Sequence, residues 1–121
     1  MSSHRIERLN SDLRRRISMQ ISRLKDPRLD PMLEVLRVNV SPDLSVAKVY
    51  IASVNGGEAA AEACEVLKGA EGHIKSELAK TMEIRRIPSL VFIPDDSVDY
   101  YNHIDSILKG LNLHDTEPAD Q

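Results

Sequence analysis

The stretch VLKGAEGHIKSEL, residues 66–78, carries two glycines three residues apart inside an otherwise helical pattern. Apolar residues recur at steps of three and four from residue 63 to residue 82, and their register continues through both glycines. This spacing predicts two helices joined by a kink rather than by a free loop. A G-x-x-G pattern can also hold a nucleic-acid backbone, but Glu71, between the glycines, would repel a phosphate.

Two segments before this stretch have the composition of strands. LEVLRVNV (33–40) and VAKVYIASV (46–54) are rich in β-branched residues and partly alternate. The intervening SPDLS contains the turn residues Pro42 and Asp43, and NGG at 55–57 ends the second segment. The pattern predicts an antiparallel hairpin.

After the kinked helices, IRRIPSLVFIP (84–94) predicts a short apolar strand at about 89–93. Asp96 or Ser97 can cap a last helix over 97–111, and NLHDTEPADQ (112–121) reads as a disordered, acidic tail. The apolar side of this helix comprises Tyr101, Ile104, Ile107, Leu108 and Leu111.

The N-terminal segment predicts an amphipathic helix that ends at KDPRLDP, where Pro27 and Pro31 disfavour helix. Arg8 and Arg15 fall opposite its apolar face, and Arg5, Arg16 and Arg23 line one flank. The apolar face consists of Ile6, Leu9, Leu13, Ile17, Ile21 and Leu24.

The predicted order is therefore α-β-β-α-(kink)-α-β-α. A three-stranded sheet covered by helices suits this order, because the second and third strands are joined by a crossover of more than about 30 residues. We predict an α+β fold of the type II KH-like class, with one domain over 1–111 and the tail at 112–121.

Composition and charge narrow the function classes. At 121 residues the chain forms one ordinary domain, and no apolar run reaches the ~20 residues that span a bilayer. The single cysteine cannot form an internal disulfide, which favours a reducing cytoplasm. The net charge is −3, yet residues 1–28 hold eight basic and three acidic side chains, whereas residues 94–121 hold one basic and seven acidic. This asymmetry suggests a partner for the basic N-terminal element.

Four stretches, in register, resemble the ribosome-binding factor A family over roughly residues 4–111. They are RIERLNSDLRRRIS (5–18) with KDPRL (25–29), SPDLSVAKVYIA (41–52), LKGAEGHIKSELAK (67–80) and IRRIPSLVFIPDDS (84–97). The resemblance implies a monomeric KH-like factor that binds the immature small (30S) ribosomal subunit and its 16S rRNA. It further implies a role in late maturation and 16S rRNA processing, notably in the cold, without catalysis, cofactor, metal or small-molecule substrate.

The family's kink is an Ala-x-Gly, which Ala70, Glu71 and Gly72 match, so that Gly69 is incidental. We expect the basic residues around the kink, the first helix and the hairpin to form one continuous surface that contacts rRNA mainly through phosphates. The predicted contact residues are Arg5, Arg8, Arg15, Arg16, Arg23, Lys48, Lys68, Lys75, Lys80, Arg85 and Arg86.

Other interpretations stay open. The arginine-rich helix can be a solvated face laced by Arg8–Asp12 and Asp12–Arg16 pairs, although three acids cannot pair eight bases. The kink can serve packing alone, and the acidic helix 97–111 can be the docking face of a protein-interaction module.

Catalytic and metal sites are disfavoured. His73 with Glu77, and Asp99 with His103, share helical faces but lack an evident third ligand. Cys64 has no neighbouring base and reads as a core thiol.

Overall fold

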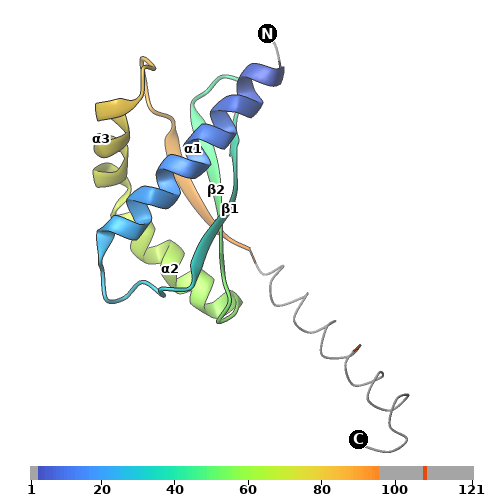
Figure 1. Cartoon of the computed structure of the whole chain (residues 1–121), viewed down its shortest axis with the longest axis vertical. Helices are drawn as coiled ribbons and strands as arrows, with labels where there is room; N and C mark the ends of the chain where they lie inside the picture. The colour runs from blue at the N-terminus through green and yellow to red at the C-terminus, as the bar shows by residue number, and fades with distance from the viewer. Residues whose placement is uncertain (1–2, 96–107, 109–121) are drawn as a thin grey trace, which may run out of the picture.

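The computed structural model of the chain describes residues 3–95 and residue 108 (Figure 1). Three helices and three strands follow in the order α1 (Ser3–Leu24), β1 (Leu33–Val40), β2 (Val46–Ser53), α2 (Gly57–Gly69), α3 (Glu71–Thr81) and β3 (Ser89–Pro94). The predicted order is confirmed as far as β3. The expected last helix, apart from Leu108, and the acidic tail lie outside the described residues.

The sheet is mixed, with the strand order β1-β2-β3. β1 and β2 form the predicted antiparallel hairpin, with a register shift between Val35 and Arg37. β3 lies parallel to β2, with Ala47 opposite Leu90 and Lys48 opposite Val91. The α2–α3 crossover makes this parallel pairing possible.

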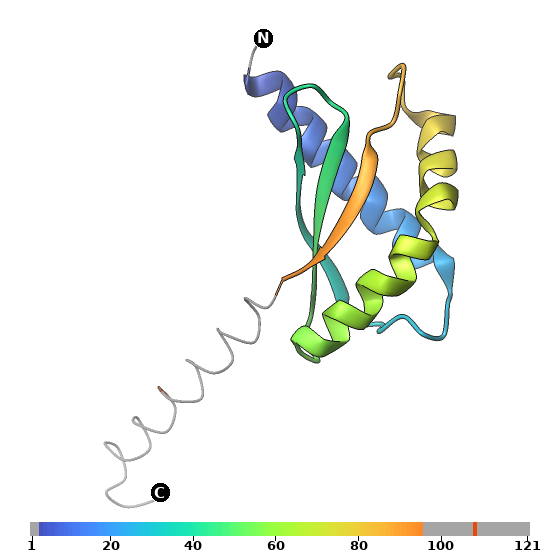
Figure 2. The same ribbon diagram turned by 180° about the vertical axis from the view of Figure 1, so that it is seen from behind.

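One face of the sheet is buried beneath the helices. Figure 1 shows α1 crossing in front of the strands, and the view from behind shows the strands in front of α1 (Figure 2). Alternation along the strands separates the two faces, since Ala47 and Val49 are fully buried while Lys48 between them is exposed. The main apolar core joins Leu13 and Ile17 of α1, Leu67 of α2, Ile74 and Leu78 of α3, and Val35, Val38, Val40, Ala47, Val49, Ile51 and Leu90 of the sheet.

The interruption between α2 and α3 falls on a single residue, Ala70, with φ −98° and ψ 4°. Its N–H bonds to carbonyl oxygens of the last turn of α2, and Ile74 N–H donates to its carbonyl oxygen at 3.0 Å, which begins α3. Neither Gly69 nor Gly72 has a positive φ, and a Cβ at either would meet no atom within 4 Å. Close helix packing therefore does not require these glycines, contrary to the packing interpretation of the kink.

The β1–β2 turn is held by one carboxylate. Asp43 Oδ1 accepts hydrogen bonds from the hydroxyls of Ser41 and Ser45, both at 2.7 Å, and from Ser45 N–H at 3.1 Å. These bonds, chiefly those from Ser45 and Ser41, lower the pKa of Asp43 to about 2. The turn places the next residue, Leu44, at φ 63°, in the left-handed region.

Candidate nucleic-acid interface

Some of the predicted contact residues are held by neighbouring side chains. Arg16 donates through Nε to both oxygens of Asp12 at 3.0 Å, and through Nη1 to Thr81 Oγ1 at 2.7 Å, which ties α1 to the end of α3. Arg15 Nη2 lies 2.5 Å from Asp12 Oδ1, and Lys80 Nζ lies 2.8 Å from Glu77 Oε2. Asp12 thus pairs with Arg15 and Arg16, and the predicted Arg8–Asp12 pair is absent among the ion pairs of the described residues.

Arg23 is neither held by an ion pair nor remote from acidic side chains. It is exposed and makes no ion pair within 4 Å in the described part of the chain, but its charge helps to lower the pKa of Glu77. The hydrogen bond from Lys80 is the larger cause of that shift. Glu77 is therefore paired with Lys80, and the charges of His73 and Arg23 add smaller contributions to the lowering of its pKa.

The remaining predicted cations have no ion-pair partner within the described ranges, 3–95 and 108. Such cations remain available to phosphate, because no carboxylate of the described residues lies within 4 Å of them. They are Arg5, Arg8, Lys48, Lys68, Lys75, Arg85 and Arg86.

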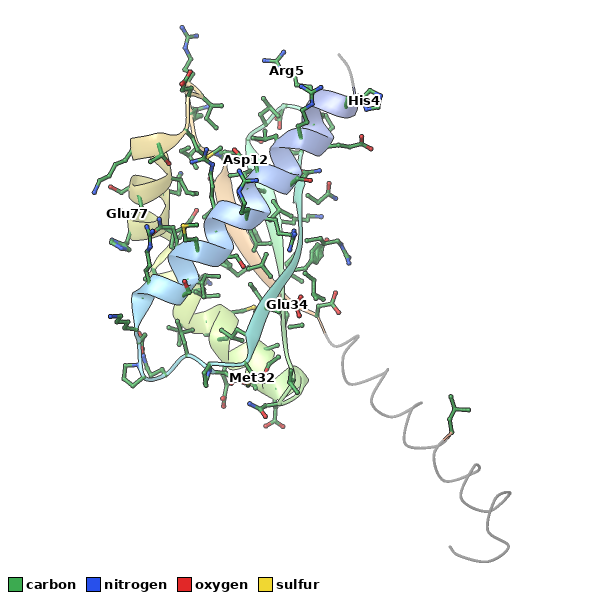
Figure 3. All side chains as sticks on the ribbon, in the orientation of Figure 1. His4, Arg5, Asp12, Met32, Glu34 and Glu77 are labelled. Atoms are coloured by element: carbon green, nitrogen blue, oxygen red, sulfur yellow. The ribbon has the colours of Figure 1, made fainter. Side chains whose placement is uncertain are left out.

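Three of these arginines gather at one end of the molecule. Arg5 comes from the first turns of α1, and Arg85 and Arg86 come from the loop between α3 and β3. Together with the β1–β2 turn they line one cavity of about 370 Å³. Figure 3 labels Arg5 at this end and Asp12 farther along the outer side of α1. The fold thus joins arginines that are 80 residues apart in the sequence.

The expectation of one continuous basic surface is wrong for Lys48. Its side chain extends from the open face of the sheet, opposite the face that the helices cover, because the neighbouring Ala47 and Val49 point into the core. Lys68 lies in the last turn of α2 and Lys75 near the middle of α3, whereas Arg85 and Arg86 follow the end of α3. The basic residues therefore fall into separate groups.

Glu71 has a structural role that sequence reasoning missed. Its Oε2 accepts a hydrogen bond from Leu90 N–H at 2.7 Å, so the first residue of α3 is joined to β3. Ser89 N–H donates to the carbonyl oxygen of Ser45, just before β2, and Asp95 N–H donates to that of Ile51 in β2, so the N–H of Leu90 points toward the outer edge of the sheet. The carboxylate at the kink thus satisfies an edge-strand donor and does not face a phosphate. No local sequence signal connects residues 71 and 90.

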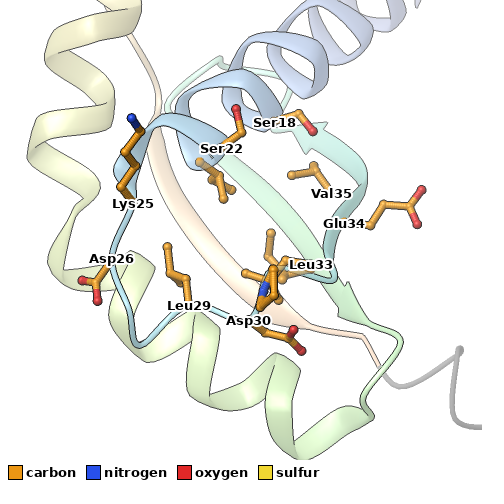
Figure 4. A pocket seen from close by; sticks show the side chains of 12 residues that line it. Ser18, Ser22, Lys25, Asp26, Leu29, Asp30, Leu33, Glu34 and Val35 are labelled. Atoms are coloured by element: carbon orange, nitrogen blue, oxygen red, sulfur yellow. The ribbon is translucent and has the colours of Figure 1, made fainter.

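A second cavity, of about 500 Å³, lies beneath the end of α1 and the α1–β1 loop (Figure 4). Ile21, Leu29 and Leu33 give it an apolar wall, and Asp30 lies at its rim. The Asp30 carboxylate accepts hydrogen bonds from the Ser53 hydroxyl and the Asn55 amide, and these lower its pKa, the bond from Ser53 being the largest cause. Asp30 therefore closes the loop onto β2.

The described residues offer no constellation for catalysis or metal binding. No group of three or more His, Cys, Asp or Glu side chains among them could hold a metal ion. Cys64 is buried, and burial raises the pKa of its thiol to about 11, so that it stays protonated at neutral pH. Asp99 and His103 lie outside the described residues. No described helix combines the length and apolar character needed to cross a bilayer.

Comparisons with known proteins place the chain in one family. The family model for ribosome-binding factor A matches residues 5–108. The chain is 38% identical to ribosome-binding factor A of Agathobacter rectalis over 86% of this chain and 90% of that protein. It is 36% identical to that of Caldanaerobacter subterraneus over 90% of each.

Comparison with solved structures leads to the same family. The crystal structure of ribosome-binding factor A from Thermus thermophilus is 35% identical with a TM-score of 0.65, over 74% of this chain and 94% of that one. The solution structure of a putative ribosome binding factor A from Thermotoga maritima is 27% identical with a TM-score of 0.71, over 79% and 92%. A further structure, 36% identical with a TM-score of 0.58 over 69% and 88%, is a Thermus thermophilus homology model fitted into the cryo-EM map of a 30S complex. The chain therefore belongs to the ribosome-binding factor A family.

Proposed function

We propose that this chain binds the small ribosomal subunit through its 16S rRNA and assists late subunit maturation in the cytoplasm, as a monomer and without a reaction of its own. The observation that carries the proposal is the group Arg5, Arg85 and Arg86, which make no ion pair among the described residues, in a chain whose net charge is −3. An acidic protein that collects such arginines at one end is suited to an anionic partner. Support also comes from the Thermus thermophilus relative, which was fitted into a 30S complex.

Within this proposal the interface runs from the arginine end along the outer side of α1. Arg8 lies on that side, one turn beyond Arg5, and makes no ion pair among the described residues. Arg15 contributes more weakly, because Asp12 already neutralises part of its charge. Lys48 lies outside this interface because it occupies the opposite face of the sheet.

Salt dependence tests the proposal. Four phosphate contacts, from Arg5, Arg8, Arg85 and Arg86, predict that log Kd changes with log salt with a slope of about 3 to 4. Co-sedimentation of the full chain with purified small subunits across a salt series measures this slope. Affinity that stays constant across the series would contradict binding through rRNA phosphates.

A further inference from the structure

The cavity at the arginine end is built by three segments far apart in the sequence. The start of α1, the β1–β2 turn and the α3–β3 loop meet at the same end of the molecule (Figure 1). They enclose about 370 Å³, which lies within the ~300–1,000 Å³ of pockets that hold small ligands. We call this cavity the apical pocket; its lining includes Arg5, Leu44, Glu83, Ile84, Arg85 and Arg86.

The apical pocket has an apolar wall that lies outside the core cluster. Leu44 is 39% exposed and Ile84 is 38% exposed, so neither serves the core. Leu44 also holds φ 63°, a conformation that a leucine adopts only at a cost and that asparagine or glycine adopts readily. Leu44 and Ile84 therefore present apolar surface to the pocket that is not part of the core cluster.

The polar groups of the apical pocket differ in their availability. Arg5, Arg85 and Arg86 have no ion pair within the described ranges. Asp43 is occupied by the turn serines, whereas Glu83 is exposed and has no hydrogen-bond partner among the described residues. The pocket therefore offers cations for phosphate, an apolar wall for an aromatic ring, and one free carboxylate as an acceptor.

We propose that the apical pocket binds a single unpaired nucleotide of RNA, with guanine preferred over uracil. The base lies against Leu44 and Ile84, and its phosphates contact the arginines. The Glu83 carboxylate accepts hydrogen bonds from two adjacent N–H groups of the base edge, which guanine supplies and uracil does not. This inference rests on the proposed function, since it defines how rRNA is engaged at that surface.

Two RNA pentamers of equal charge test the proposal, the single strands UUGUU and UUUUU. Because their phosphates are identical, a difference in affinity reports the central base alone. We expect the full chain to bind UUGUU about tenfold more tightly than UUUUU, because a single base held in the pocket contributes about that much affinity. Backbone amide NMR shifts at residues 44, 45, 83 and 84 should saturate with the same affinity.

Two variants assign the preference to the pocket. Leu44→Asn removes the apolar wall and relieves the positive φ, so we expect an unchanged or higher unfolding midpoint together with loss of most of the preference for guanine. Glu83→Gln should reduce the preference without weakening binding of UUUUU, because it removes a negative charge near the phosphates. Three results would overturn the proposal for the pocket. These are equal affinity of the unmodified chain for both pentamers, no binding of UUGUU, or amide shifts confined to other residues.

The two proposals fail separately. Loss of salt-dependent binding to small subunits would overturn the proposed function. Retained subunit binding without discrimination between the pentamers would overturn the apical pocket alone.

Discussion

Reversing two charges, Arg85→Glu with Arg86→Glu, is expected to weaken binding to purified small subunits on the order of 100-fold at physiological salt. Each arginine lines the apical pocket and makes no ion pair within 4 Å among the described residues, so both can contact phosphate. The loss of two contacts should also lower the slope of log Kd against log salt by about two. Co-sedimentation or fluorescence anisotropy across a salt series measures both quantities.

A charge-matched variant controls for net charge. Arg37→Glu with Lys48→Glu makes the same change in net charge on the open face of the sheet, where Arg37 lies over the ring of Tyr50 at 4.0 Å. We expect at most a few-fold loss of affinity, from long-range repulsion alone. Equal losses in the two double variants would mean that total charge, and not the arginine end, determines binding.

Removing the Glu71 carboxylate, Glu71→Ala, is expected to destabilise the domain by about 1–3 kcal/mol, because the part-buried N–H of Leu90 loses its acceptor. The carboxylate also lies in the first turn of α3, where a negative charge favours the helix by about 0.3–1 kcal/mol. Urea unfolding followed by circular dichroism measures the change in the free energy of unfolding.

Glu71→Gln separates the two effects, since its amide oxygen can still accept from Leu90 while the charge is gone. We expect it to recover more than half of the stability that Glu71→Ala loses. If the alanine variant unfolds at the same urea concentration as the unmodified chain, the contact between α3 and β3 does not stabilise the fold.

The secondary structure was largely predictable because each element carries a local signal. Strand alternation places Ala47 and Val49 inward and Lys48 outward, and the helical register through 63–82 places Leu67, Ile74 and Leu78 in the core. The kink was predicted because that register continues across it. The family resemblance placed it at Ala70, Glu71 and Gly72, and the backbone interrupts the helices at Ala70, whereas neither glycine has a positive φ.

The site was less predictable, because availability of a charge depends on partners distant in sequence. The place of Arg16 on α1 predicts contact with rRNA. In the structure, however, its guanidinium donates hydrogen bonds to Asp12 and to Thr81, which is 65 residues away. In the sequence, Glu71 suggests repulsion of phosphate. The structure shows instead that its carboxylate accepts a hydrogen bond from Leu90 N–H. The exposure and the positive φ of Leu44 likewise could not be predicted from the sequence, in which it is one apolar residue of a turn beside a strand.

Hydrogen exchange of the full chain, with and without purified small subunits, tests most directly the claim that the arginine end and α1 contact rRNA. We predict slower exchange on binding in residues 5–12, 43–45 and 83–86, and unchanged exchange in β3 residues 91–93, which border the open face of the sheet. Protection that is confined to 91–93, or no protection anywhere at saturating subunit concentration, would contradict the claim.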